Sequence, residues 1–304
     1  MASVVYKGKD KKVTHHKSYR LVRVTPMIGR LVNEHIRPTF VQTTQPKQNP
    51  SQYGFTENVT YLMGALQRYE CEKHCLDMKK TFFGCSLDGD SAFEVVNRNI
   101  QTRELYMAGI EGDYWQSNYH SYQDSVTKIK MNQKLSREIK ETLGVKQGHI
   151  NSSDHYKVYI GPCLDMLEDA QLGVWIGPIN SGVSGCADDV FLLTDNPVKL
   201  QALIDMAEHY GKLYRIQYGA LKTKITVSGP DVDVQYYKDT QPWNMAGQPI
   251  EVVENNEHLR QIVSGSRQEK KNVDLRIKKS RNILFALLGP AFSFKFSGRS
   301  SFLC

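Results

Sequence analysis

The sequence contains no long hydrophobic run. No stretch approaches the ~20 consecutive apolar residues that a membrane-spanning helix needs, and the mean hydropathy is −0.46. The first residues, MASVVYKGKDKKVTHHK, are polar and basic and lack the apolar segment of a secretion signal. We therefore expect no membrane partner, no secretion, and a location in the cytoplasm, the nucleus or both.

Cysteine is scarce, and repeats and low-complexity tracts are absent. Six cysteines in 304 residues are too few for a disulfide scaffold, which favours a reducing compartment. Hydrophobic residues make up 40% and charged residues 23%, and these proportions exclude a disordered or fibrous chain. At roughly 150 residues per lobe, the length predicts about two lobes. The net charge of +7 is compatible with an anionic partner.

Helix and strand patterns intermix without a strict alternation, which predicts an α+β fold. One helix begins at Asn196-Pro197 and is closed by Gly211, and another is capped by Thr25 and ends at Pro38. A helix between Ser152 and Leu167 must be kinked or split by Gly161-Pro162. The other expected elements are a helix capped by Asn58 with Val59, Leu62, Leu66 and Tyr69 on its apolar face, a helix over Ala92–Met107, a surface loop at 41–54, a loop at 112–123, strands near 214–218 and 222–227, a hairpin within 248–265 and a basic helix over 272–288.

The most informative residues are carboxylates at the ends of apolar strands. Phe82–Leu87 predicts a buried strand that stops at Asp88, and Asp188-Asp189 lie at a predicted hairpin turn. Neighbouring carboxylates repel and are costly to bury unless a cation compensates. Alone, the Asp-Asp pair is typical of a solvated turn. Together with Asp88 it predicts an oxygen-rich site for hard dications, Mg²⁺ first and Mn²⁺ second, with Asp90 as a rival ligand.

Between these strands lies the string Gly144-Val145-Lys146-Gln147-Gly148. Glycines let the backbone approach a ligand closely, and a glutamine side chain both donates and accepts hydrogen bonds. Alone the string is typical of a simple turn. Its position between Asp88 and Asp188 is what points to a role beside the carboxylates.

Seven stretches, in order, resemble the successive motifs of the reverse transcriptase domain of LINE-like (non-LTR) retrotransposons. The two most specific are LDGDSAFEVVNR, which resembles the first catalytic-aspartate motif, and CADDVFLL, which resembles the Y/F-x-DD hairpin. The others are SYRLVRVTPMIGRLV (fingers), QYGF (the Q-x-GF element), GVKQGH (template and nucleotide), LQALIDMAEHYGKLYRIQYGALKTKITVSG (a helix–strand motif ending in lysine) and HLRQIVSG (a primer-grip-type hairpin). The resemblance covers roughly residues 17–290.

The resemblance implies a role for each matching residue. The implied catalytic residues, of which the three acids would hold two metal ions, are Asp88, Asp188, Asp189 and Lys222. Lys222 would neutralise or protonate the departing pyrophosphate, with Lys224 as a rival, and Phe93 would disfavour a ribose 2′-hydroxyl. The implied nucleotide-binding residues are Arg20, Gly89, Phe93, Gln147 and Gly148.

The same resemblance implies a right-hand polymerase that extends a DNA primer with dNTPs on an RNA template. The expected parts are a basic flexible tail (1–16), fingers (17–83), a palm built on a small antiparallel sheet (84–265, with finger insertions at about 110–150) and a partial helical thumb (266–304). A basic stretch follows the palm, where a thumb would contact template–primer phosphates in a salt-sensitive manner. Its residues include Arg267, Lys270, Lys271, Arg276, Lys278, Lys279 and Arg281.

Some residues depart from the family pattern. Cys186 stands where the hairpin usually has Tyr or Phe, and Arg260 where the primer-grip-type motif usually has Gly. Because no continued thumb follows and no endonuclease domain precedes, we expect a fragment or a decayed copy. A non-catalytic nucleic-acid-binding remnant is therefore the alternative function. Another palm-type nucleotidyltransferase, such as a cyclase, is a third, against which the GVKQG string and the basic terminal helix argue.

Two further clusters have simpler interpretations. Cys71, His74 and Cys75 have the spacing of part of a zinc site, but no second Cys/His pair is nearby in the sequence. Ser152-Ser153-Asp154-His155 contains hydrolase residue types, but a catalytic triad is defined by spatial geometry, and capping of a helix by either serine is the better interpretation.

Overall fold

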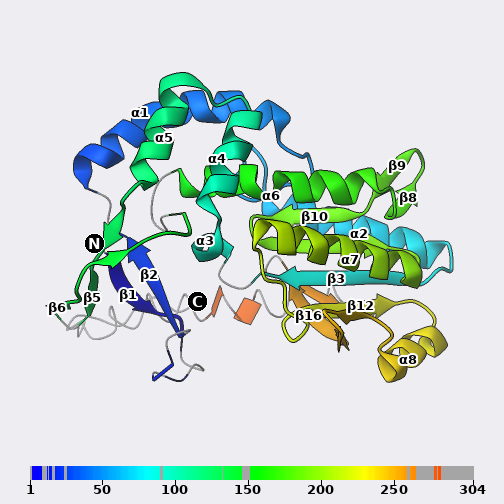
Figure 1. Ribbon diagram of the computed structural model, residues 1–304. Coiled ribbons are helices and arrows are strands. Elements are labelled where there is room, and N and C mark those ends of the chain that lie inside the picture. Colours follow the sequence, from blue (N-terminus) through cyan, green and yellow to red (C-terminus); the bar gives the residue numbers. More distant parts are fainter. Residues whose placement is uncertain are drawn as a thin grey trace, which may run out of the picture.

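The computed structural model describes residues 2–8, 12, 14–15, 18–23, 26–89, 92–131, 133–145, 151–258, 261–264, 277–278 and 280–281. A five-stranded sheet with helices packed on it lies at one end of the molecule, and a smaller sheet lies at the other (Figure 1). Helices α1, α4 and α5 form a second group above the smaller sheet in this view. Helices and strands are mixed throughout, so the predicted α+β class is confirmed.

The larger sheet has the strand order β10-β11-β3-β12-β15. Its strands are β10 (Val183–Cys186), β11 (Asp189–Thr194), β3 (Phe82–Asp88), β12 (Lys224–Ser228) and β15 (Glu251–Val252). Neighbouring strands are antiparallel except β12 and β15, which are parallel. The apolar run predicted to be a buried strand is thus the central strand, β3, which has a neighbour on each side.

The helical segments of the described residues, in chain order, are α1 (Met27–Thr44), the 3-10 turn η2 (Gln45–Lys47), α2 (Tyr61–Asp77), α3 (Ala92–Val95), α4 (Arg98–Met107), α5 (Gly112–Tyr122), α6 (Ser152–Asp169), α7 (Pro197–Tyr214) and α8 (Asp231–Thr240). Within the described residues, every helix is too short or too polar to cross a membrane.

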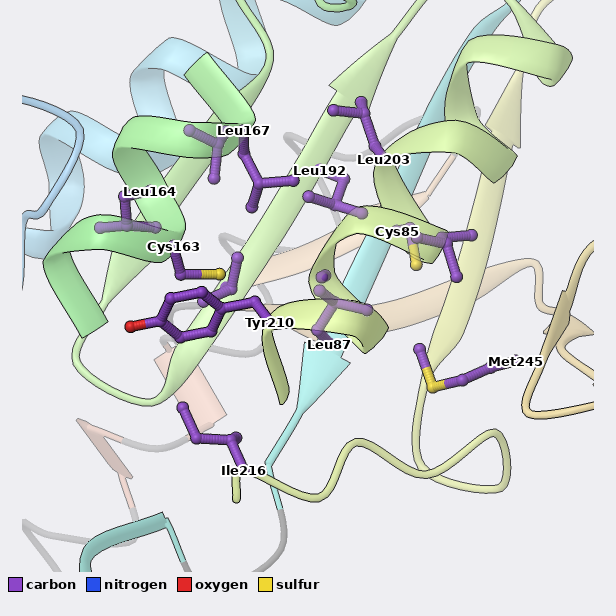
Figure 2. Packing of buried hydrophobic residues seen from close by; sticks show 14 of the residues in the cluster. Cys85, Leu87, Cys163, Leu164, Leu167, Leu192, Leu203, Tyr210, Ile216 and Met245 are labelled. Atoms are coloured by element: carbon purple, nitrogen blue, oxygen red, sulfur yellow. The ribbon is translucent and has the colours of Figure 1, made fainter. Parts of the chain in front are cut away.

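One face of the large sheet packs against α6 and α7. Side chains alternate between the faces of a strand, and Cys85 and Leu87 of β3 share this core with Leu192 of β11 (Figure 2). The helices contribute Leu164 and Leu203, which are fully buried. Burying a leucine side chain contributes about 2 kcal/mol, so this layer strongly fixes the register of β3 against β11.

Helix α2 covers part of the opposite face, where Cys71 and Cys75 pack against Phe82, Phe191 and Leu193. We expected this helix to be capped by Asn58 and to bury Val59, Leu62, Leu66 and Tyr69. It begins at Tyr61 with Thr60 as cap, and Leu62 and Leu66 are 42% and 57% exposed.

The prediction of the α2 face was wrong because part of the buried face is charged. Arg68 and Glu72 are buried and form an ion pair of 2.7 Å. Glu72 also accepts a hydrogen bond of 2.6 Å from the Ser228 hydroxyl of β12. A buried charge is tolerated when it is paired and hydrogen-bonded in this way, and a pattern based on hydrophobicity misses such a face.

The smaller sheet has the order β2-β1-β5-β6, with strands β1 (Ala2–Tyr6), β2 (Tyr19–Arg23), β5 (Ile129–Met131) and β6 (Lys134–Leu135). Strand β1 is antiparallel to β2 and parallel to β5. Ala2 is fully buried, and its backbone N–H donates to the carbonyl of Lys128 at 2.9 Å. The expectation that residues 1–16 form a tail is therefore wrong for Ala2–Tyr6.

The remaining strands form two-stranded ribbons: β4 (Val126–Thr127) with β7 (Ile139–Lys140), β8 (Val174–Ile176) with β9 (Ile179–Ser181), β13 (Asn244–Met245) with β14 (Gln248–Pro249), and β16 (Asn255–His258) with β17 (Gln261–Ser264). The hairpin expected within 248–265 is the β16–β17 pair.

Two helices pass through prolines: Pro38, which was expected to end α1, and Pro162, which with Gly161 was expected to kink or split α6. Helix α1 continues past Pro38 to Thr44, and α6 is continuous across Pro162. Pro38 lies on an exposed part of α1, so water can satisfy the carbonyl that loses its intrahelical donor. In α6, buried side chains on both sides of Gly161-Pro162 hold the helix in place. The expected cap Thr25 lies outside the described residues.

Other boundaries also differ from the predictions. The segment Ala92–Met107 is divided into α3 and α4, because the side chain of Asn97 caps α4 by accepting from the N–H groups of Asn99 and Ile100. Helix α7 runs past Gly211 to Tyr214. A Cβ on Gly211 would lie 2.5 Å from the Ile216 carbonyl oxygen, so this glycine permits a close approach instead of ending the helix.

Most of the segment 112–123, where a loop was expected, forms helix α5 (Gly112–Tyr122). Tyr114 and Trp115 pack against a cluster containing Phe40 and Leu105, and the Trp115 indole donates to the carbonyl of Thr102 at 2.9 Å. Tertiary contacts thus stabilise a helix whose residues have weak helix propensity. The expected strand at 214–218 is reduced to a single bridge between Gly89 and Tyr218.

Candidate active site

The central sheet brings Asp88 and Asp189 together at one edge. They are direct partners in the antiparallel β3–β11 pair, and such partners have Cα atoms about 4.5–5.5 Å apart. Because Cys85 and Leu87 face the helices, alternation places Asp88 on the other face, together with Ser86. The strand ends predicted to carry the carboxylates are therefore adjacent in the fold.

Asp188 lies in the tight turn between β10 and β11. The turn residue before it, Ala187, has φ +60°, a left-handed conformation that costs a residue with a Cβ about 1 kcal/mol. Burial raises the pKa of Tyr156, and the negative charge of Asp188 adds to this effect.

The site carries excess negative charge. Partial burial raises the pKa of Asp189 to about 6, and the charges of Asp188 and then Asp88 add to this effect. The Lys222 ammonium group lies 3.7 Å from an Asp88 carboxylate oxygen. One half-exposed lysine at this distance compensates only part of the negative charge of the three acids, so the site can attract further cations.

The three carboxylates suit a hard dication that is held in an open site. In the described part of the chain, no three His, Cys, Asp or Glu side chains, the three acids included, converge closely enough to hold a metal ion by themselves. Mg²⁺ is commonly held by only one or two carboxylates and completes its octahedral shell with water and substrate phosphates. The oxygen-only set of Asp88, Asp188 and Asp189 matches that chemistry.

Asp189→Asn is expected to stabilise the metal-free protein at neutral pH. The unfolded-state pKa is near 3.8 and the folded-state pKa about 6, so the bound proton stabilises the fold below pH 4 and this contribution is lost as the pH rises through 6. Solvent screens part of the effect. We expect the variant to gain about 2 °C in melting temperature over the wild type between pH 4 and pH 7.5, with EDTA present. An equal difference at both pH values would contradict the raised pKa of Asp189.

The two candidate lysines differ in position. Lys222 precedes β12 and lies beside Asp88, whereas Lys224 pairs with Glu251 at 2.5 Å. Of the rivals, Lys222 is thus the one beside the carboxylates. Lys224 belongs to a polar row that includes Ser86, whose hydroxyl accepts a hydrogen bond of 2.6 Å from Asn256.

Phe93 lies on α3, just beyond Asp88, and its ring stacks on Tyr156 with centroids 4.7 Å apart. The GVKQG string starts against the same short helix, because the N–H of Val145 donates to the carbonyl of Phe93 at 2.9 Å. Gly144 has φ +82°, and a Cβ there would lie 2.7 Å from the carbonyl oxygen of Glu94. The first two residues of the string thus meet the Phe93 helix directly.

Residues 8–278 match the family described as reverse transcriptase (RNA-dependent DNA polymerase). The chain belongs to the reverse transcriptase family. It is also similar to the "Retrovirus-related Pol polyprotein from type-1 retrotransposable element R2" of Popillia japonica, with 26% identity over 219 residues. This match covers 71% of the chain and 30% of the relative, so the chain spans about a third of that relative's length. The predicted non-LTR reverse transcriptase domain is confirmed.

Solved structures with a similar fold include telomerases. An apo telomerase from Candida tropicalis, truncated from its C-terminal domain, aligns with a TM-score of 0.55 at 10% identity over 83% of this chain and 52% of that one. Telomerase from Candida tropicalis in complex with a TWJ fragment of telomeric RNA gives 0.52 at 11% identity, over 82% and 43%. At such identities the likeness concerns the fold, and it confirms the expected right-hand polymerase architecture.

The residues implicated by the reverse transcriptase motifs away from the carboxylates lie partly inside and partly outside the described residues. Gln147 and Gly148 of the GVKQG string lie outside the described residues, as do Asp90 and Arg260. Arg20 lies in β2, opposite Val5. Of the basic residues after the palm, Lys270, Lys271 and Lys279 are also outside, while Lys278 and Arg281 are helical and exposed.

Of the remaining candidates, Gly89 forms the bridge with Tyr218 beside the carboxylates. Cys186 ends β10 opposite Asp189, and burial together with the neighbouring acids raises the pKa of its thiol to about 11. Cys71 and Cys75 are buried in the apolar layer between α2 and the sheet.

Sequence reasoning missed the residues that hold the carboxylate turn in this reverse transcriptase. Residues 41–54 were expected to be a surface loop, yet Asn49, Ser51 and Gln52 are buried. Gln52 contacts Ala187 of the turn directly. The QYGF string that contains Gln52 was the available signal, but a polar loop pattern does not reveal which strand the loop will contact.

Proposed function

We propose that this chain is an RNA-directed DNA polymerase domain that uses two Mg²⁺ ions bound by Asp88, Asp188 and Asp189. The observation that carries the proposal is the direct pairing of Asp88 with Asp189, with Asp188 in the adjoining turn. Family membership and the similarity to a retrotransposon polyprotein support RNA as the template. A DNA primer, dNTPs and action in the cytoplasm or nucleus complete the proposal.

The proposed reaction is the attack of a primer 3′-hydroxyl on the α-phosphate of a dNTP, with pyrophosphate leaving. Paired metal ions lower the pKa of the attacking oxygen and stabilise charge on the leaving one. Phosphoryl transfer otherwise needs mainly positioning and electrostatics from the protein. The rigid β3–β11 register supplies the positioning, since Asp88 and Asp189 come from strands that the α6–α7 core holds together.

Two further residues have proposed roles in this reaction. Lys222, 3.7 Å from Asp88, neutralises or protonates the departing pyrophosphate. Phe93 is held against Tyr156 near the carboxylates and disfavours the 2′-hydroxyl of a ribonucleotide. Of the basic residues assigned to template–primer phosphates, Lys278 and Arg281 are exposed.

Asp188→Ala is expected to abolish dNTP incorporation on poly(rA)/oligo(dT) in the presence of Mg²⁺. Removing one ligand leaves the metal ions and the negatively charged substrate without their anchor in the turn. The matched control is Asp239→Ala, which removes an exposed carboxylate from α8 and should keep full activity. Equal incorporation by the wild type and Asp188→Ala would refute the catalytic role.

The non-catalytic remnant predicts a different outcome in the same assay. Binding of template–primer would weaken with salt, as phosphate contacts do, but no variant or metal concentration would change incorporation above background. A cyclase-like nucleotidyltransferase would consume nucleotide without extending an annealed primer.

A further inference from the structure

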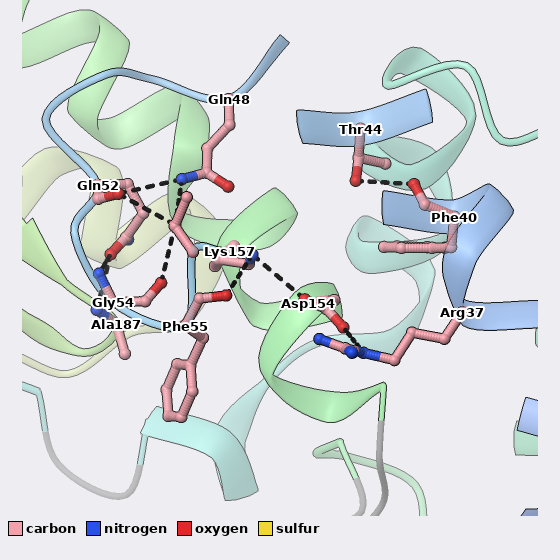
Figure 3. Close-up of polar contacts among 11 residues, drawn as sticks. Arg37, Phe40, Thr44, Gln48, Gln52, Gly54, Phe55, Asp154, Lys157 and Ala187 are labelled. Carbon is pink, nitrogen blue, oxygen red and sulfur yellow. Dashed lines mark hydrogen bonds and ion pairs between the residues drawn. The ribbon is translucent and has the colours of Figure 1, made fainter. Parts of the chain in front are cut away.

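The turn that carries the catalytic acids is held by a buried glutamine from a distant loop. The side-chain oxygen of Gln52 accepts hydrogen bonds from the backbone N–H of Ala187 and from that of Gly54, each at 2.9 Å (Figure 3). Gln52 is only 2% exposed. Since both partners are donors, the amide must present its oxygen to them, which fixes its orientation.

The loop that carries Gln52 runs beside β10 and hydrogen-bonds to this edge strand of the large sheet. The N–H of Gly185 donates to the carbonyl of Ser51 at 2.8 Å, and the N–H of Tyr53 donates to the carbonyl of Gly185 at 2.7 Å. Gly54 then packs against the turn itself, since a Cβ there would lie 2.5 Å from the Ala187 nitrogen. The loop therefore follows the strand up to the turn.

The loop is anchored in turn to α6. The Lys157 ammonium group donates to the carbonyl of Phe55 at 2.8 Å and pairs with Asp154 at 3.2 Å, and Asp154 also pairs with Arg37 at 2.8 Å (Figure 3). Asn49 donates to carboxylates farther along α6, those of Asp165 and Glu168, both at 2.8 Å. These contacts fix the loop that carries Gln52 to α6.

We propose that Gln52 is a positioning residue for the carboxylates, holding the left-handed peptide of Ala187 and so the directions of Asp188 and Asp189. This inference rests on the proposed function for its effect on catalysis. Without the bond, Ala187 can relax toward a right-handed conformation, which rotates the following carboxylates away from Asp88. The other end of the Gln52 amide has no hydrogen-bond partner among the described residues, so the acceptor is what this buried side chain contributes.

Gln52→Met tests this assignment, with Gln48→Met as the matched control. Methionine keeps the length of the side chain but removes the acceptor. Gln48 lies in the same loop and donates to the Gln52 carbonyl at 3.0 Å and to the Thr56 hydroxyl at 2.7 Å. Its replacement also removes two hydrogen bonds from the loop but none from the turn. Gln52→Glu retains the acceptor and provides a second variant in case Gln52→Met does not fold.

Two readouts are measured: hydrogen exchange at the Ala187 amide, and primer extension as a function of Mg²⁺ concentration. We expect Gln52→Met to lose about tenfold in Ala187 protection and about tenfold in extension rate, the value of one hydrogen bond of about 1.4 kcal/mol. Its affinity for template–primer without metal should stay within twofold. Gln48→Met, and Gln52→Glu in Ala187 protection, should stay within twofold of the wild type.

The results separate this inference from the proposed function. Unchanged Ala187 protection in Gln52→Met, equal losses in Gln52→Met and Gln48→Met, or equal losses of protection in Gln52→Met and Gln52→Glu would overturn the positioning role. If the wild type incorporates no dNTP, the proposed function fails, and the exchange measurement decides by itself whether Gln52 holds the turn.

Discussion

Asp88→Asn is expected to lower primer extension about a thousandfold, and adding Asp188→Ala should lower it little further. A metal clamp contributes several kcal/mol to transition-state stabilisation, and about 4 kcal/mol corresponds to a thousandfold in rate. Residues that act as one unit give strongly non-additive losses. Because Asp88 and Asp189 are direct strand partners and Asp188 adjoins them, either change dismantles the same site.

The matched control for Asp88→Asn is Asp195→Asn. Asp195 follows the other end of β11 and pairs with Lys80 at 2.9 Å, so its replacement also removes one negative charge and one lysine pair. We expect the control to retain wild-type extension. Losses that multiply in the double variant would mean that Asp88 and Asp188 serve separate steps, contrary to the proposal.

Arg98→Met is expected to destabilise the fold by about 3–5 kcal/mol, the usual result of breaking a buried ion pair. Arg98 is 8% exposed and donates to the carbonyls of Gly144 at 3.0 Å, Tyr122 at 3.2 Å and Glu141 at 2.5 Å. It also pairs with the Glu141 carboxylate at 3.4 Å. Methionine would leave these carbonyls buried without a donor, which adds a desolvation cost.

Urea unfolding measures this loss, with Arg103→Met as the control. Arg103 lies on the same helix and pairs with Glu104, but its side chain is 61% exposed, so we expect a change below about 1 kcal/mol. Similar losses of unfolding free energy in both variants would contradict the stabilising role assigned to the buried contacts of Arg98. Because Gly144 opens the GVKQG string, Arg98→Met should also weaken dNTP binding in the proposed reaction.

The two strands that carry the carboxylates were predictable because their sequence signals are local. An apolar run ends at an acid in β3 and follows two acids in β11, and one antiparallel pairing then places Asp88 beside Asp189. The core residues of β3 and β11 follow the period of two that a sheet imposes. The outline of the active site could therefore be predicted, and the family motifs added the assignment of roles.

What the sequence could not reveal depends on contacts between distant segments. The buried face of α2 is partly charged because Glu72 meets Ser228 of β12, which no pattern within the helix indicates. Helix α5 forms because Trp115 finds the carbonyl of Thr102. In the same way, the oxygen of Gln52 gains its role only when its loop meets Ala187.

The order of strands in the large sheet has a consequence for synthesis on the ribosome. Strand β3 is made early, whereas both of its neighbours, β11 and β12, are made late. Pairings between distant segments form slowly and leave strand edges open until the partner arrives. Strand β3 therefore lacks its neighbours through much of translation, and Asp88 can meet Asp188 and Asp189 only after β11 has left the exit tunnel.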